Sequence, residues 1–115
     1  MFRKIAAKEL AKFIQPLAHF VRIQIIQELR SGELDVSTLQ KIIGLPQSSV
    51  SQHLAILKGH HLIKERKEGR RVYYNLISPD LALWLLSGID LLTKTEKLEE
   101  SLGQAVVEAR EVWTP

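Results

Sequence analysis

The chain has 115 residues, of which 45% are hydrophobic and 25% charged, and it contains no cysteine. A chain of this length and composition forms one domain, here expected over residues 1–115, with a single modest core. The lack of cysteine excludes disulfides, thiolate metal sites and cysteine nucleophiles from it. The longest apolar run, Leu81 to Leu86, is far shorter than the ~18 residues of a membrane span, so we expect a cytoplasmic protein without a membrane partner.

The net charge of +3 is unevenly distributed along the chain. Residues 1–79 hold thirteen Lys and Arg against six Asp and Glu, whereas residues 80–115 hold three against seven. The first part therefore carries +7 and the second −4. A basic body with an acidic tail suggests a polyanionic partner for the first part. A solvated surface with uneven charge is the plainer alternative.

Three prolines stand at the starts of apolar periodic stretches, where the first turn of a helix tolerates proline. Three glycines follow such stretches, where a left-handed cap favours glycine. These residues are Pro16, Pro46 and Pro79, and Gly32, Gly44 and Gly59. They predict helices over residues 4–14, 16–31, 37–43, 47–58 and from 79 onward. Ser37 and Gln40 have the spacing of a capping box at the start of the third helix.

Between residues 59 and 78 the pattern changes from helical to extended. Residues 62–66 and 71–77 are rich in β-branched, aromatic and alternating residues, and Gly69 lies in the turn between them. A wing over residues 62–77 is therefore expected as a two-stranded hairpin, which must lie against the helices because a lone hairpin is barely stable. The expected fold is mainly α with a small β-hairpin, in the order four helices, hairpin, long helix.

Residues 37–58 have the pattern of a helix-turn-helix. In the second helix Val50, Leu54 and Leu57 form one stripe that can pack inward. The residues at its start that face away from the stripe are short, uncharged and able to donate and accept hydrogen bonds, namely Gln47, Ser48, Ser49 and Gln52. Such side chains suit base edges and phosphates in a major groove, which accepts one helix. A polar face turned to solvent explains the same spacing equally well.

The basic hairpin that follows favours nucleic acid. Five cations lie within eight positions, offset only by Glu65 and Glu68. They are Lys64, Arg66, Lys67, Arg70 and Arg71. A basic hairpin beside a recognition helix can contact phosphates or enter the minor groove. A charged edge that prevents strand aggregation does not require an excess of positive charge, so the two motifs together predict double-stranded DNA as the partner.

The segment from Leu17 to Leu76 resembles the ArsR/SmtB family of bacterial winged-helix repressors. The resemblance rests on Val50-Ser51-Gln52-His53-Leu54 followed by Gly69-Arg70-Arg71-Val72-Tyr73-Tyr74. It implies a winged helix-turn-helix homodimer in which the first and last helices form the interface and two recognition helices bind a palindromic operator. It also implies the DNA-contacting residues, which are Gln47, Ser48, Ser49, Ser51, Gln52 and His53, with Arg66, Lys67, Arg70 and Arg71 in the wing. Pro46 departs from the family pattern, which often has a capping serine there.

The metal-sensing residues of the family are missing from this chain. Asp35 and Ser37 stand where the third-helix site has two cysteines, and no histidine follows His61. Because zinc prefers Cys and His ligands, we expect no metal and no cofactor. A small-molecule or protein effector stays open. Ser49 and His53 have the spacing of a nucleophile and its base, but no carboxylate is placed to orient them, so we expect no enzyme.

From residue 79 to 113 apolar residues recur every three or four positions, which predicts a long helix weakened near its glycines. Its first part is apolar nearly all round, and one small domain can cover only one side of it. We therefore expect an isologous dimer interface built from residues 4–14 and 79–113. Its expected residues are Ile5, Leu10, Phe13, Leu81, Trp84, Leu85, Ile89 and Leu92. The alternatives are a protein–protein interaction module without DNA binding, and a small-molecule receptor with a ligand pocket near Trp84 at the dimer interface.

Overall fold

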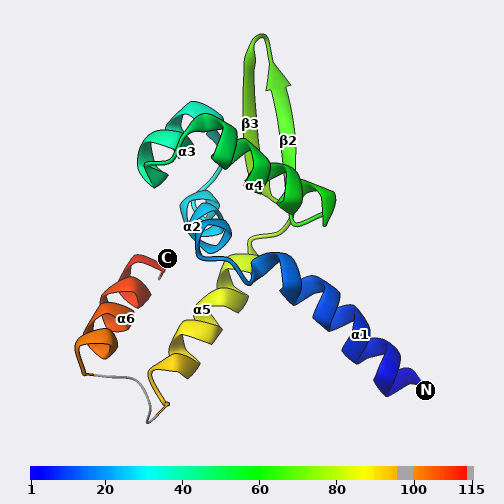
Figure 1. Ribbon diagram of the computed structural model, residues 1–115, viewed down its shortest axis with the longest axis vertical. Coiled ribbons are helices and arrows are strands. Elements are labelled where there is room, and N and C mark those ends of the chain that lie inside the picture. Colours follow the sequence, from blue (N-terminus) through cyan, green and yellow to red (C-terminus); the bar gives the residue numbers. More distant parts are fainter. Residues whose placement is uncertain (96–99, 114–115) are drawn as a thin grey trace. The chain divides into compact units, whose positions relative to one another are not determined.

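The computed structural model describes residues 1–95 and 100–113 (Figure 1). The chain divides into two compact units, residues 1–78 and 79–115. The first unit contains a 3-10 helix over Gln15–Leu17 and seven other elements, which are α1 (Phe2–Ile14), α2 (Phe20–Leu29), β1 (Leu34–Asp35), α3 (Val36–Ile43), α4 (Gln47–Gly59), β2 (Ile63–Glu68) and β3 (Arg71–Leu76). The described part of the second unit contains α5 (Asp80–Leu92) and α6 (Glu100–Trp113). This order confirms the mainly helical winged helix-turn-helix fold.

The core of the first unit lies between α2, α3, α4 and the base of the wing. Its fully buried side chains come from all three helices, and Leu62, Ile63 and Leu76 add the base of the hairpin. The largest of the buried side chains are Ile25, Ile26, Leu29, Leu39, Leu54, Leu57 and Val50. The stripe predicted on α4 thus faces the core, and the opposite side of that helix is left exposed.

The sheet has a third strand that the sequence did not predict. All pairs are antiparallel in the order β1-β3-β2, so the expected hairpin is present as β2 and β3, and β1 extends it to three strands. β1 pairs with β3 at two positions, Leu34 with Tyr74 and Asp35 with Tyr73. β2 and β3 pair from Ile63–Leu76 to Glu68–Arg71 around a two-residue turn. Gly69 opens that turn with φ 59°, a left-handed conformation that favours glycine.

Predicted helix boundaries differ from the structure at His19 and at Gly59. The helix expected over residues 16–31 is interrupted at His19, whose backbone is extended and whose Nδ1 accepts a hydrogen bond from the Val21 N–H at 3.2 Å. His19 is therefore the N-cap of α2. Gly59 lies inside α4, and His61 takes the positive φ of 59° expected of a capping glycine. Gly44, by contrast, ends α3 in the left-handed conformation, as predicted.

In the second unit two helices replace the single long helix expected from residue 79. α5 ends at Leu92 and α6 begins at Glu100, and the two helices contact each other. The Arg110 guanidinium donates a hydrogen bond to the Asp90 carboxylate and so ties α6 to α5. No helix within the described ranges 1–95 and 100–113 is long and apolar enough to cross a bilayer.

Candidate nucleic-acid interface

The start of α4 presents a polar surface. Gln47, Ser48, Ser51 and Gln52 are exposed, and Ser49 is half-buried at the flank. No side chain of the described residues caps this end of the helix, because Pro46 occupies the N-cap position. The Ser49 N–H donates to the Pro46 carbonyl at 3.1 Å. The N–H groups of Gln47 and Ser48 precede the first helical hydrogen bond, and the positive end of the helix dipole lies there. This end of α4 therefore suits an anion such as a DNA phosphate.

His53 is placed differently from the other predicted contact residues on α4. It is half-buried, and its ring centre lies 4.5 Å from that of His19. Its buried Nδ1 and the buried Nε of Arg22 have no hydrogen-bond partner among the described residues. Burial, followed by the charges of His19 and Arg22, lowers the pKa of His53. No group of three or more potential metal ligands occurs in the described part of the chain.

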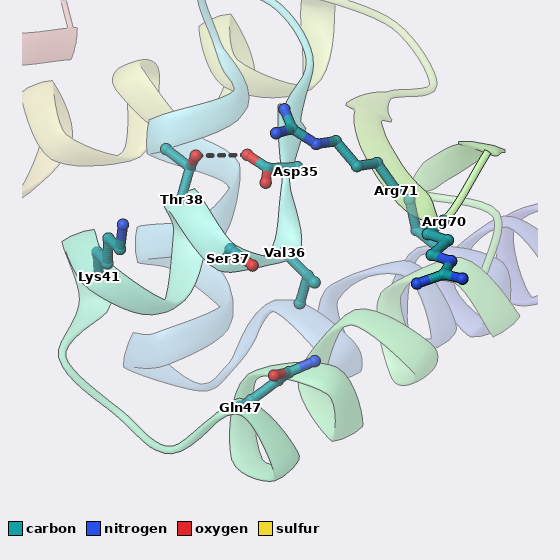
Figure 2. Close-up of a pocket in the computed structure, with 9 residues that line it drawn as sticks. Asp35, Val36, Ser37, Thr38, Lys41, Gln47, Arg70 and Arg71 are labelled. Carbon is teal, nitrogen blue, oxygen red and sulfur yellow. Dashed lines mark hydrogen bonds between the residues drawn. The ribbon is translucent and has the colours of Figure 1, made fainter. Parts of the chain in front are cut away.

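A hollow of about 500 Å³ lies between the start of α3, the start of α4 and the wing tip (Figure 2). Its lining combines three cations with hydroxyl and amide groups and one carboxylate. The lining residues are Asp35, Val36, Ser37, Thr38, Lys41, Gln47, Arg70, Arg71 and Val72. The Asp35 carboxylate accepts a hydrogen bond from the Thr38 hydroxyl, which lowers the pKa of Asp35. The helix-turn-helix and the wing thus border one basic depression, whose lining suits backbone phosphates.

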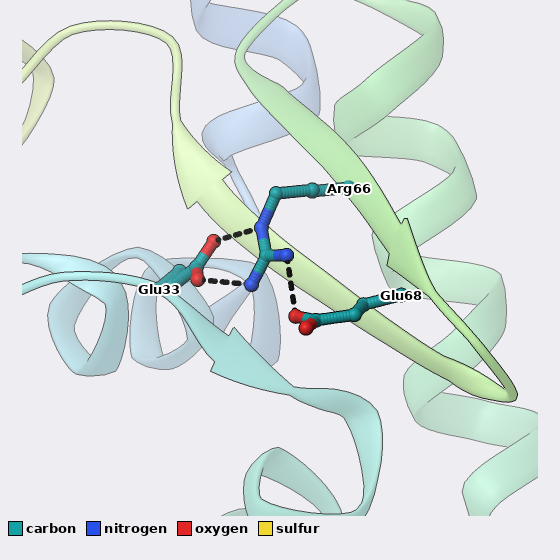
Figure 3. A network of polar contacts seen from close by, with 3 residues as sticks. All are labelled: Glu33, Arg66 and Glu68. Atoms are coloured by element: carbon teal, nitrogen blue, oxygen red, sulfur yellow. Dashed lines mark hydrogen bonds and ion pairs between the residues drawn. The ribbon is translucent and has the colours of Figure 1, made fainter.

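The four predicted wing cations are not equivalent. Arg70 is exposed and makes no hydrogen bond or ion pair with any other residue that the structure describes. Lys67 is also exposed. Arg71 extends toward Asp35 in Figure 2, and a side-chain hydrogen bond with Tyr73 raises its pKa. Arg66 differs from all three, because its guanidinium is bound by the carboxylates of Glu33 and Glu68 (Figure 3).

Two acidic residues of the wing have roles that the sequence did not reveal. Glu65 Oε1 lies 2.7 Å from Lys58 Nζ at the end of α4, and this hydrogen bond lowers the pKa of Glu65. Tyr74 bonds the same carboxylate, and burial raises the pKa of its hydroxyl. Glu68 bonds Arg66. The available signal was the alternation of acids with cations along residues 64–68, but alternation alone does not identify the partner of each acid.

The residues expected at a dimer interface are mostly uncovered. α1 has no buried residue at all, and Ile5 and Leu10 are each 51% exposed. Trp84 and Leu92 on α5 are also exposed, whereas Phe13, Leu85 and Ile89 are half-buried. Leu81 is only 6% exposed, so it offers little surface to a partner. A shallow apolar hollow of about 250 Å³ lies on α5 at Trp84 and Leu91.

Known proteins share this fold and much of this sequence. A family model described as "Bacterial regulatory protein, arsR family" matches residues 21–65. The transcriptional repressor PagR of Bacillus anthracis is 36% identical over 70 residues, which cover 60% of this chain and 70% of PagR. The transcriptional activator HlyU of Vibrio cholerae is 38% identical over 68 residues, which cover 59% of this chain and 63% of HlyU. The chain thus spans about two thirds of the length of these relatives.

A solved structure extends the similarity beyond the matched sequence motif. The crystal structure of M. tuberculosis Rv0081 matches with a TM-score of 0.71 and 30% sequence identity. The match covers 77% of this chain and 90% of that chain.

Proposed function

The chain belongs to the arsR family of bacterial regulatory proteins, and we propose that it binds a palindromic operator as a homodimer and represses transcription there. Membership makes it a DNA-binding transcriptional regulator. One observation supports the mode of binding above all others: the polar start of α4 and the basic wing tip border the same hollow. A single duplex can contact both, with α4 in the major groove.

The two elements have different tasks in this proposal. Lys67, Arg70 and Arg71, with the N-terminal end of α4, contact phosphates and supply most of the affinity. Gln47, Ser48, Ser49 and Gln52 select bases, and a glutamine can form two hydrogen bonds with adenine. Ser51 contacts the backbone beside them. His53 acts mainly by packing against His19, which fixes the orientation of α4.

A second copy of the chain is the proposed occupant of the uncovered face of α1. At about 100° per residue, Ile5, Leu10 and Phe13 lie on one face of that helix, and Lys4 lies on the other. The apolar face is exposed within the described chain. Two copies that bury the same face form an isologous dimer, and the two-fold symmetry of that dimer requires a palindromic site. The exposed apolar residues of α5 join this interface.

Repression is the direction that the name of PagR supports, whereas HlyU carries the name of an activator. A dimer that covers a promoter excludes polymerase, and we propose this mode for the present chain. We assign the protein to the cytoplasm, where operator DNA lies, and give it no catalytic reaction.

Selection of bound fragments from the source genome tests this function. The Kd for a selected fragment is then measured by fluorescence anisotropy against a scrambled duplex of the same composition, at about 50 and 200 mM salt. We expect the selected fragment to bind more tightly, and its affinity to fall by about 10³-fold between the two salt concentrations. Equal affinity for both duplexes, or affinity that does not change with salt, would contradict the proposal.

A further inference from the structure

The side chain of Arg66 crosses the sheet. It stands on β2 directly opposite Tyr73 of β3, and its guanidinium carbon lies 4.6 Å from the centre of the Tyr73 ring. Beyond the tyrosine it reaches Glu33, the residue that precedes β1. Figure 3 shows the guanidinium between the carboxylates of Glu33 and Glu68. One side chain therefore links β2 and β3 to Glu33, the residue that precedes β1.

Every nitrogen of this guanidinium is engaged. Nε donates to Glu33 Oε2 at 3.1 Å and Nη2 donates to Glu33 Oε1 at 2.6 Å, while Nη1 donates to Glu68 Oε2 at 2.7 Å. The two bonds from Arg66 lower the pKa of Glu33. Two carboxylates surround one guanidinium, so the cluster has a net negative charge. A phosphate that approaches Arg66 is therefore repelled by the carboxylates on either side of it.

The wing tip has few other attachments on this side of the sheet. β1 pairs with β3 at only two positions, so Arg71, Val72 and the turn lie beyond the paired segment. A single exposed ion pair contributes little to stability. A two-pronged contact between arginine and a carboxylate nevertheless fixes the orientation of both groups. Glu68 forms the last strand pair before the turn, so its bond to Arg66 extends this constraint to the tip.

We propose that Arg66 is a positioning residue whose bonds to Glu33 and Glu68 hold the wing tip where Lys67 and Arg70 reach DNA, and that Arg66 itself contacts no phosphate. The inference replaces the sequence-based placement of Arg66 among the DNA contacts. The part of this inference that concerns DNA contact rests on the proposed function. The inference also implies that an acidic residue, Glu33, favours binding to a polyanion. The charge of Glu33 alone predicts the opposite effect.

The variant Glu33→Ala separates positioning from direct contact. It removes a negative charge and no cation, so the charge change alone strengthens binding to DNA. If Arg66 positions the tip, Glu33→Ala instead weakens binding about three- to tenfold and lowers the salt slope by about one, because a phosphate contact of the tip is lost. Glu111→Ala is the matched control, since it removes the same charge from an exposed position on α6. This control should neither weaken binding nor lower the salt slope.

Two further variants test whether the two-pronged contact between Arg66 and Glu33 is needed. Arg66→Lys keeps the charge but cannot form the two-pronged contact, so it should bind DNA as weakly as Arg66→Ala. The double variant Glu33→Ala with Arg66→Ala should be no weaker than either single variant, because all three remove the same constraint. Full affinity in Arg66→Lys, together with tighter binding by Glu33→Ala, would show that Arg66 contacts phosphate directly and would overturn the proposal.

Amide hydrogen exchange of the free protein supplies a measurement that needs no DNA. Glu33→Ala should speed exchange at the wing tip, residues 67–72, and leave α2 and α4 unchanged. If wild type fails to bind duplex DNA while this change in exchange is present, the proposed function falls and the positioning contact stands. If exchange at the tip is the same in Glu33→Ala as in wild type, the contact does not hold the tip, and the inference is wrong whatever the protein binds.

Discussion

Lys58 Nζ lies 2.7 Å from Glu65 Oε1, and this ion pair joins the last turn of α4 to β2. Tyr74, which pairs with Glu65 across the hairpin, bonds the same carboxylate. The opposite face of the sheet carries the contact between Arg66 and Glu33. The wing is thus attached on one face to α4 and on the other to the approach to β1. The element proposed to contact bases and the element proposed to contact phosphates are therefore attached to each other.

Removal of the Arg70 guanidinium from the wing tip should weaken binding to all duplexes alike. Arg70 is exposed and has no partner among the described residues, so we expect its guanidinium to contact a phosphate. Arg70→Ala should lower affinity for selected and scrambled duplexes by the same factor and reduce the salt slope by about one per protomer. Anisotropy titrations at several salt concentrations measure both. Lys94→Ala, which removes one exposed cation from the acidic unit, is the control and should change neither.

Removal of a glutamine from α4 should change base preference and leave the salt slope intact. Gln52 is exposed on the face opposite the buried stripe. Gln52→Ala should lose about 1–3 kcal/mol of discrimination at one base pair in each half-site. Competition with duplexes substituted one position at a time measures this. Gln104→Ala alters an exposed glutamine on α6 and should retain the wild-type preference; a wild-type preference in Gln52→Ala would remove Gln52 from the recognition surface.

Charges on the apolar face of α1 should separate the dimer. Ile5 and Leu10 are each 51% exposed, and a second copy that covers them would be repelled by buried carboxylates. The double variant Ile5→Asp with Leu10→Asp should sediment as a monomer and bind a single half-site weakly. Lys4→Asp places a carboxylate on the opposite face of the same helix and should remain dimeric. A wild-type protein that is monomeric at micromolar concentration would contradict this interface.

Acid should destabilise the fold through His53. Its pKa is lowered from the ordinary value of 6.5 by burial and then by His19 and Arg22, so the unfolded chain binds a proton that the folded chain does not. The free energy of unfolding should therefore fall as the pH is lowered through 6.5 toward the folded-state pKa. Urea titrations between about pH 7 and 5 measure this change. His53→Gln should flatten the dependence, whereas His60→Gln, at an exposed histidine, should not.

The carboxylates of Glu33, Asp35 and Glu65 affect the free energy of unfolding at a lower pH than His53 does. Hydrogen bonds from Arg66, Thr38 and Lys58 lower the pKa values of Glu33, Asp35 and Glu65. Each bond therefore adds stability above the ordinary pKa of its carboxyl, and this stability is lost as the pH falls through the lower folded-state value. These losses begin below about pH 4.5. A fall in stability already present near pH 6 lies above this window, where the lowered pKa of His53 acts.

The hydrophobic periodicity and the positions of proline and glycine predicted the fold where the local signal and the tertiary structure agree. The stripe Val50, Leu54 and Leu57 is fully buried, and Gly44 caps α3 in the left-handed conformation. The capping box at Ser37 is wrong, because the helix begins one residue earlier and Asp35, bonded to Thr38, occupies the N-cap position. The spacing could not reveal that the cap lies two residues earlier, at Asp35 in place of Ser37, since Asp and Ser are equally good caps.

Long-range partners account for the features that the sequence did not reveal. β1 has two residues and no period of its own, so it exists only because β3 offers an unpaired edge. Glu33 lies 33 positions from Arg66, and no local pattern connects them. The exposed face of α4 was predictable because it follows from one helix and its stripe. The distinction between Arg66 and Arg70 required the fold.

Amide chemical shifts during a titration with duplex DNA test the central claim most directly. That claim is that the start of α4 and the wing tip bind one duplex together. With ¹⁵N-labelled protein and a selected fragment, the account predicts saturable changes of the same apparent Kd at residues 47–52 and 67–71. Changes confined to residues 79–113, or changes in α4 without any in the wing, would contradict it.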